Sequence, residues 1–252
     1  MIHLPVSTHR HSRMGLTLRS RWPIVLAAIS MLALAVSWNM RVNEMLKVQT
    51  VAIEGNHRVS DSSVRHLSDI YLDTYTWMLS AKHIERKLVK HPWIRQADVE
   101  IRFPNRVSIT IEEQEPVLLL ASDYFWYIND SGIVFRRAAS DNMDFPVLTG
   151  INPTYFDEHP HIAQRIISDA LSLFETVDIP LIGGKDNISE IHFDRIDGYS
   201  VLLRNGTEII FGFYPPDGRI QRLRTMVAKG LTLNLPQRIE LDAEKIALVT
   251  PL

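Results

Sequence analysis

Hydrophobic and polar positions divide the chain into one long apolar run and two regions of short alternating segments. The run begins at Trp22 as WPIVLAAISMLALAV, and no charged residue occurs between Arg21 and Arg41. The nineteen residues between these arginines form a helix of about 28 Å at about 1.5 Å per residue, which matches the hydrocarbon core of a bilayer. Trp22 and Trp38 stand near its ends, where amphipathic rings prefer the interface. The pattern predicts a transmembrane helix over residues 22–40.

Two other interpretations of this run compete with a retained anchor. A buried core helix would carry a polar stripe on one face, which the run lacks. A cleaved signal peptide would suit the basic start, but the run is long for a signal and only Ala33-Leu34-Ala35 resembles a cleavage site. We therefore expect a retained anchor. Residues 1–21 contain no acid and four arginines, Arg10, Arg13, Arg19 and Arg21. The positive-inside rule places this tail in the cytoplasm and the bulk of the chain outside it.

The first alternating region predicts a small α+β module directly after the span. Residues 48–54 alternate as a half-buried strand does. Ser60 is placed to cap a helix that begins at Asp61, and a second helix is expected after Ser80, with Pro92 as its end. A hairpin then follows, so the predicted order is strand, helix, helix, strand, strand.

The hairpin shows the clearest alternation in the chain. Its inward positions are Ala97, Val99, Ile101 and Phe103 before the Pro104-Asn105 turn, and Val107, Ile109 and Ile111 after it. One apolar and one charged face predict a sheet that is covered on one side only. We expect the core of the module to rest on four of these side chains, Val99, Ile101, Val107 and Ile109, with Ser108 on the opposite face.

The second region, from Pro116 onward, predicts a mixed, β-rich domain. Asn205-Gly206 is the strongest short hairpin signal in it. Apolar residues at helical spacing predict one helix through Ile162–Phe174 and another over Asp217–Ala228. The expected strands are 117–121, 125–128, 133–135, 188–193, 199–203, 207–211, 238–241 and 246–249. The overall fold class is therefore α+β: an N-terminal transmembrane helix and two small modules.

Charge and chemistry narrow the functional classes. The net charge is −2, and without the four tail arginines the rest of the chain carries about six more acids than bases, which argues against nucleic-acid binding. The absence of cysteine excludes disulfides and thiolate chemistry. None of the ten histidines stands in a metal-binding motif, and no phosphate-binding or nucleophile motif occurs. Glu112, Glu113 and Glu115 are interpreted as solvated charges. We expect no cofactor, metal site, small-molecule substrate or catalysis.

Two stretches of the first module resemble a known family. VAIEGNHRVSDSSV and KLVKHPWIRQADVEIRFPNRVSITIEEQEPV are similar to a POTRA domain, and the HPWI stretch entering the hairpin resembles the bacterial cell-division family of FtsQ and DivIB. WYINDSGIVF and FPVLTG continue the likeness. The resemblance implies a cytoplasmic tail over 1–21, a span over 22–40, a POTRA domain over 47–115 and an FtsQ-type β domain over 116–252. It also implies residence in the inner membrane at the division septum.

The resemblance further implies a scaffold that recruits FtsB and FtsL, and through them the septal wall synthase and other membrane division proteins. In this family the FtsB contact lies on the last strands and on one arginine. The matching residues are Arg195, Arg238, Ile239, Leu241, Ile246, Leu248, Val249 and Thr250. An aromatic anchor known in relatives has no equivalent before the sequence ends at Pro251-Leu252. Residues 246–249 carry no charge, which suits either an open docking edge or an internal strand.

Two alternatives remain for the function. The chain could be a POTRA scaffold of another export or envelope-assembly system, or a cell-wall enzyme anchored in the same way. The partners captured from crosslinked membranes would separate the three hypotheses.

Overall fold

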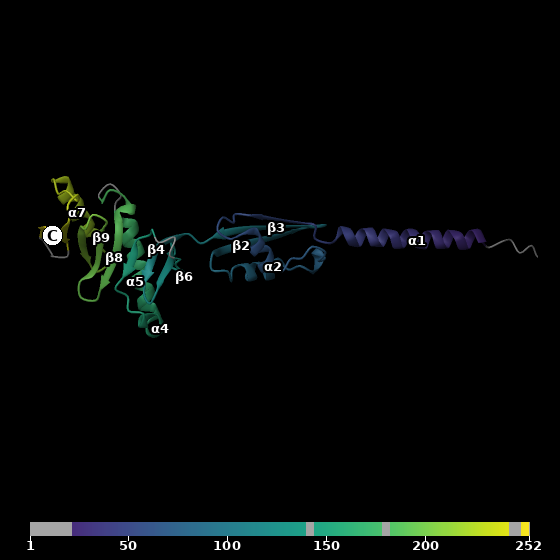
Figure 1. The fold of residues 1–252 in the computed structure, drawn as a ribbon, viewed down its shortest axis with the longest axis horizontal. Coiled ribbons are helices and arrows are strands. Elements are labelled where there is room, and N and C mark those ends of the chain that lie inside the picture. The colour runs from purple at the N-terminus through teal and green to yellow at the C-terminus, as the bar shows by residue number, and fades with distance from the viewer. Residues whose placement is uncertain (1–21, 140–143, 178–181, 242–247, 252) are drawn as a thin grey trace, which may run out of the picture. The chain divides into compact units, whose positions relative to one another are not determined.

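The structure is a computed structural model that describes residues 22–139, 144–177, 182–241 and 248–251. The described residues form two compact units. One comprises residues 22–52, 70–79 and 101–108, and the other comprises residues 53–69, 80–100 and 109 onward. Figure 1 labels the elements along the chain.

Helix α1 (Trp22–Met45) contains the long apolar run. None of its residues is buried, which excludes the core-helix interpretation. It is long and apolar enough to cross a membrane. The helix continues beyond the predicted end of the span at residue 40, so Arg41 and Glu44 also lie on helical backbone.

The first module is a three-stranded sheet with the order β1-β3-β2. Its elements are β1 (Thr50–Glu54), α2 (Asp61–Ser68), the short helix η1 (Thr76–Met78), α3 (Ala81–Leu88), β2 (Ile94–Arg102) and β3 (Arg106–Glu113). The predicted order is confirmed. Ser60 caps α2 as expected, because its hydroxyl accepts a hydrogen bond of 3.2 Å from the backbone N–H of Ser63.

Burial along the hairpin agrees with the predicted alternation except at its tip. Val99, Val107 and Ile109 are buried, whereas Ile101 is only half-buried. The inward assignment of Phe103 is wrong, since its side chain is 65% exposed. The reason is local: β2 ends at Arg102, so Phe103 lies in the turn, where the alternation of a strand no longer applies.

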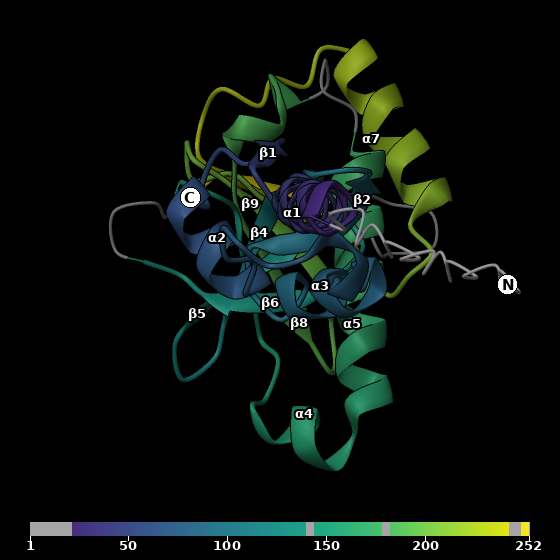
Figure 2. The ribbon, with the colours of Figure 1, turned by 90° about the vertical axis from the view of Figure 1, so that its right-hand side faces the viewer.

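Among the described residues, the second module is built on a nine-stranded sheet with the order β12-β11-β10-β9-β8-β7-β4-β5-β6. Figure 2 labels β4, β5, β6, β8 and β9 of this sheet. The strands are β4 (Pro116–Ala121), β5 (Phe125–Asn129), β6 (Val134–Arg137), β7 (Val147–Thr149), β8 (Ile188–Asp194), β9 (Gly198–Leu203), β10 (Glu208–Gly212), β11 (Gln237–Glu240) and β12 (Leu248–Pro251). The helices are α4 (Thr154–Glu158), α5 (Pro160–Thr176), the short η2 (Lys185–Asn187) and α7 (Asp217–Ala228). The pairs β4–β7, β7–β8 and β10–β11 are parallel, and the other neighbours are antiparallel.

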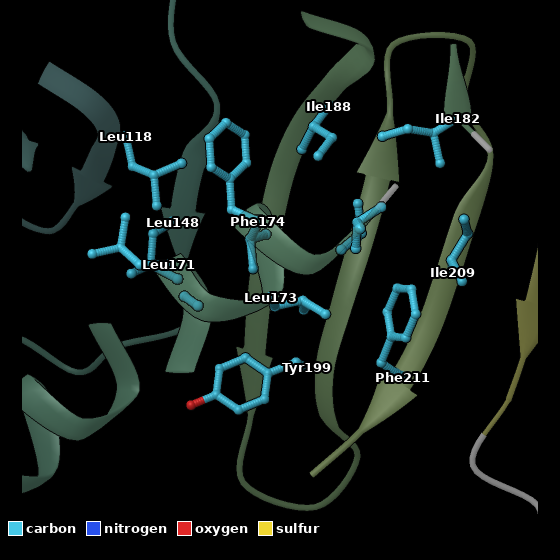
Figure 3. Packing of buried hydrophobic residues seen from close by; sticks show 14 of the residues in the cluster. Leu118, Leu148, Leu171, Leu173, Phe174, Ile182, Ile188, Tyr199, Ile209 and Phe211 are labelled. Atoms are coloured by element: carbon cyan, nitrogen blue, oxygen red, sulfur yellow. The ribbon is translucent and has the colours of Figure 1, made fainter. Parts of the chain in front are cut away.

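One hydrophobic core joins this sheet to α5 and α7. Alternate strand residues such as Leu118, Val201 and Ile239 belong to the same buried cluster as Phe174 of α5 and Leu223 of α7. Figure 3 shows the side chains of α5 packed among those of the strands. The predicted stripe of α5 is buried apart from Ile162, which is 48% exposed in the first turn of the helix.

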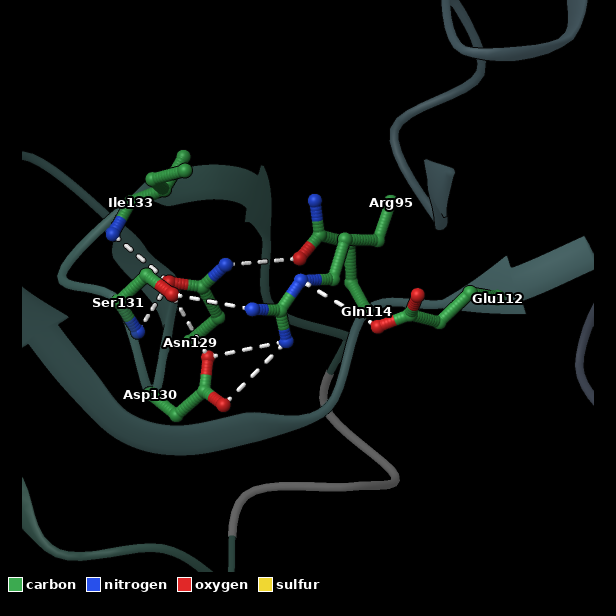
Figure 4. Close-up of polar contacts among 7 residues, drawn as sticks. All are labelled: Arg95, Glu112, Gln114, Asn129, Asp130, Ser131 and Ile133. Atoms are coloured by element: carbon green, nitrogen blue, oxygen red, sulfur yellow. Dashed lines mark hydrogen bonds and ion pairs between the residues drawn. The ribbon is translucent and has the colours of Figure 1, made fainter. Parts of the chain in front are cut away.

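A polar cluster surrounds the β5–β6 turn (Figure 4). The buried amide of Asn129 donates to Gln114 Oε1 at 2.8 Å, and its Oδ1 accepts from the backbone N–H groups of Ser131 and Ile133. Beside it, Arg95 Nη1 lies 3.2 Å from Asp130 Oδ1. The hydroxyl of Ser131, followed by Arg95, lowers the pKa of Asp130. Because Asn129 satisfies two backbone groups of its own turn, this tight turn is held from inside.

The interpretation of Glu113 as a solvated charge is wrong. Its carboxylate accepts hydrogen bonds from three consecutive backbone N–H groups, those of His57, Arg58 and Val59, at 2.8–3.0 Å. Successive N–H groups that converge on one anion form a backbone nest. Glu113 thus fixes the loop before α2 to the end of β3.

Candidate functional site

The predicted partner-binding strands lie at one edge of the nine-stranded sheet. Strand β12 is the outermost described strand on that side and pairs only with β11 among the described strands. All four of its residues are exposed, including Leu248 at 55% and Val249 at 37%. Residues 248 and 249 of the predicted strand 246–249 are confirmed as strand, which extends to Pro251, whereas residues 246 and 247, including the candidate Ile246, lie outside the described residues. An exposed, uncharged edge strand is a template for another strand.

The backbone direction of β12 follows from one hydrogen bond in β11. The N–H of Leu241 donates to Ile210 O of β10 at 2.9 Å. Backbone groups alternate sides along a strand, so those of Arg238 and Glu240 face β12. Their register partners are Thr250 and Leu248, which therefore face β11. The N–H and C=O of Val249 consequently point away from the sheet, toward the open edge.

Two of the candidate residues have a structural role. The side chains of Ile239 and Leu241 are completely buried and belong to the core cluster. Arg238 is half-buried on the opposite face of the sheet, where its Nε lies 3.0 Å from Glu240 and its Nη1 lies 3.4 Å from Glu208. Strand β11 therefore supports β12, and the exposed candidates on these two strands are Leu248, Val249 and Thr250.

Arg195 is not brought next to these residues. It follows β8 in the turn to β9, with its guanidinium 5.9 Å from the ring centre of Tyr155. Strand β8 lies four strand-to-strand spacings from β12, which at about 4.8 Å per spacing places Arg195 about 19 Å from β12. The strand register nevertheless puts Leu248, Glu240, Ile210, Ser200 and His192 in one row, and the β8–β9 turn lies just beyond it. Arg195 and Leu248 thus lie at the same end of the sheet.

A polar row on the sheet face opposite the core was missed from the sequence. Thr149 hydrogen-bonds to Glu190 and, at 2.7 Å, to His192 Nδ1. Further along, His192, Glu208 and Arg238 line a shallow depression of about 210 Å³. At its rim, the backbone N–H groups of Ile196 and Asp197 lower the pKa of Asp194. The signal available in the sequence was the alternation of these residues with buried ones, which marks a solvent-facing side.

No part of this edge has the geometry of a metal centre. Within residues 22–139, 144–177, 182–241 and 248–251, no group of three or more His, Asp or Glu side chains is arranged to hold a metal ion. The described histidines are distributed over both modules. The chemistry that this edge offers is backbone hydrogen bonding, two apolar side chains and a flanking row of charges.

An N-terminal helix long and apolar enough to cross a membrane, a POTRA-type module and a β-rich domain define the class of the chain: a two-module α+β protein with a candidate membrane anchor. Comparison with protein families identifies residues 46–114 as an FtsQ-type POTRA domain. Residues 120–242 match the C-terminal region of the cell division proteins FtsQ and DivIB. The chain belongs to the FtsQ/DivIB family of cell-division proteins.

Individual relatives agree with this assignment. The cell division protein FtsQ of Syntrophotalea carbinolica is 29% identical over 183 residues, which cover 72% of this chain and 65% of the relative. FtsQ of an Anaeromyxobacter species is 26% identical over 229 residues, 88% of this chain and 77% of the relative. The cell division protein DivIB of Bacillus subtilis is 28% identical over 152 residues, 60% of this chain and 53% of the relative. The matches thus span between about half and three quarters of these relatives.

Proposed function

We propose that the chain is a divisome scaffold of the bacterial inner membrane that recruits an extended segment of a partner, of the FtsB type, to the open edge of β12. Through FtsB and its partner FtsL it would connect to the septal wall synthase. The observation that carries the proposal is the outward-facing backbone of Val249 on an exposed, uncharged edge strand. Strand addition to such an edge is an established mode of peptide recognition.

The edge alone is too small to give a stable complex. Val249 offers one N–H and one C=O, and Pro251, which faces the same side, offers only a C=O. Three hydrogen bonds at about 1 kcal/mol each give about 3 kcal/mol, whereas micromolar affinity requires about 8 kcal/mol. Side-chain contacts must supply the remainder. Leu248 and Val249 are the nearest apolar anchors, and Arg195 would engage a partner that continues past the strand for about 19 Å.

We also propose that the N-terminus is cytoplasmic and that both modules lie outside the cytoplasm, with no catalytic role. The four arginines that precede α1 support this topology. Alkaline phosphatase fused to the C-terminus should be active, and a reporter that works only in the cytoplasm should be inactive there. The opposite pair of results would overturn the topology.

Val249→Pro is the sharpest test of the docking edge. It removes the outward N–H but no donor of the β11–β12 ladder, and proline is tolerated on the open side of an edge strand. We expect crosslinked FtsB and FtsL to be lost from the material that copurifies with the full chain, at an unchanged melting temperature. Val249→Ala is the matched control, because it trims the side chain and keeps the N–H.

Normal recovery of FtsB and FtsL with Val249→Pro would overturn the docking edge. Recovery of an export machine with the unchanged chain would support the alternative scaffold, and wall-cleaving activity would support the anchored enzyme. In both cases the divisome proposal fails, since it requires FtsB and FtsL among the captured proteins.

A further inference from the structure

The compact unit that contains α1 exposes five large apolar side chains outside the helix. We call them the aromatic patch: Tyr71, Leu72, Trp77, Met78 and Phe103. Each is 62–67% exposed. Four come from the segment Ile70–Leu79, and Phe103 comes from the β2–β3 turn. Single exposed apolar residues are ordinary, but five within so small a unit indicate a surface that something covers.

Both segments of the patch are hydrogen-bonded to the residues that directly follow α1. The backbone N–H of Val48 donates to Thr74 O at 2.9 Å, and that of Gln49 donates to Asn105 O at 2.9 Å. Thr76, whose side chain is almost completely buried, donates from its hydroxyl to Leu46 O at 2.9 Å and to Pro104 O at 2.8 Å. Figure 1 shows these segments at the end of the small sheet to which α1 connects. The patch is therefore held beside residues 46–49, which follow the C-terminal end of α1 and which we call the helix exit.

The length of α1 sets the depth of this exit in a membrane. The uncharged stretch ends before Arg41, and the helix continues from there to Met45. Five residues rise about 7.5 Å, whereas each headgroup layer is about 5–8 Å thick. Leu46 thus emerges near the outer side of the headgroup layer. Side chains held beside Leu46 are within reach of the depth that tryptophan and tyrosine prefer.

The charges around the patch fit a lipid surface. Arg102 and Arg106 flank Phe103 in the sequence, the arrangement of an apolar side chain between cations that suits an interface with phosphates. The segment Ile70–Leu79 contains one charged residue, Asp73. Lys47 Nζ, which lies 2.6 Å from Glu44, also lies 3.9 Å from the carboxylate of Asp73, so this single acid has a cation beside it.

We propose that the lipid headgroup interface covers the aromatic patch, so that the first module lies on the membrane as well as being tethered to it. The inference rests on the proposed anchoring by α1 and is independent of the docking edge. The contact fixes the height at which the small sheet starts above the bilayer. Thr76 is the positioning residue, because it connects both segments of the patch to the helix exit.

The absence of cysteine allows single labels on the full chain. We would introduce Leu72→Cys, Met78→Cys, Leu32→Cys in the middle of α1, and Lys90→Cys on an exposed site of the other unit. Each variant is labelled with the environment-sensitive fluorophore NBD and reconstituted into lipid vesicles as the only protein. The quencher is a nitroxide carried by the headgroup or the upper acyl chain of the lipid.

We expect the nitroxide lipid to quench labels at Leu72 and Met78 severalfold more than the label at Lys90, with a blue-shifted emission. Quenching no greater than at Lys90 would overturn the inference, provided that the label at Leu32 reports lipid. A label at Leu32 that reports water would instead overturn the anchoring itself. Because the vesicles contain no other protein, quenching cannot come from a protein partner. Labels at Leu72 and Met78 that report water would instead indicate that a protein partner covers the patch.

Discussion

Replacing Glu113 by alanine tests how a single carboxylate holds the loop before α2. The wild-type carboxylate accepts from the three backbone N–H groups of His57, Arg58 and Val59. A hydrogen bond to a charged group contributes about 1.5–3 kcal/mol, but water replaces part of each bond where the loop is exposed. We therefore take about 1 kcal/mol for each of the three. Glu113→Ala should lower the free energy of unfolding by about 3 kcal/mol.

In thermal unfolding, a loss of about 3 kcal/mol corresponds to a decrease in melting temperature of about 12–24 °C for a domain of the size of the POTRA domain, residues 46–114. Circular dichroism of the full chain in detergent measures it. Hydrogen exchange adds a local readout, since the amides of residues 57–59 should lose their protection. The loop should lose its protection even where global stability is only partly reduced.

Glu112→Ala is the matched control for this prediction. Its carboxylate lies 3.5 Å from Arg95 Nε and is 57% exposed, so its removal should cost no more than about 1 kcal/mol. Equal melting temperatures for the two variants would refute the reasoning, because a backbone nest and a surface ion pair would then contribute alike.

Three further predictions concern other sites. Ile109→Ala should cost about 2–5 kcal/mol in urea unfolding because Ile109 is fully buried, and Ser108→Ala should cost little; equal losses would contradict the strand register. Burial lowers the pKa of His91, so the unfolded chain binds the proton more readily and stability should fall as the pH falls below about 6.5. His91→Gln should flatten that dependence between pH 7.5 and 5.5. Asn129→Ala leaves the Gln114 carbonyl oxygen without its donor and should cost about 1–3 kcal/mol; a change within about 0.5 kcal/mol would contradict the buried turn.

Periodicity and capping chemistry were sufficient for most of the fold. The hairpin over residues 94–113, the cap at Ser60 and the helix Asp217–Ala228 follow from local signals that the structure confirms. These signals are local because the apolar period and the cap act within one element. Phe103 shows where such reasoning ends: alternation predicts the side of a side chain only while the backbone remains a strand.

The sites depend on contacts that no local pattern contains. Glu113 meets residues 57–59 because the loop before α2 returns to the end of β3, a separation of more than fifty residues. Similarly, the sequence did not decide whether β12 is an internal strand or an edge strand, since an uncharged run suits both. Only the pairing order of the sheet distinguishes the two, and it puts β12 outermost among the described strands.

The two borders of the nine-stranded sheet have different consequences for stoichiometry. At the border opposite β12, the last described strand is β6, which carries the exposed Arg136 and Arg137. Copies of a protein can polymerise through their sheets only if one border of the sheet pairs with the opposite border of the next copy. Such a head-to-tail contact, when it does not close into a ring, grows into a filament. Two adjacent arginines oppose such joining by charge and bulk, as gatekeeper residues do. If a partner strand adds at β12 as we propose, the addition would be self-limiting, and each copy of the chain would take up one foreign strand.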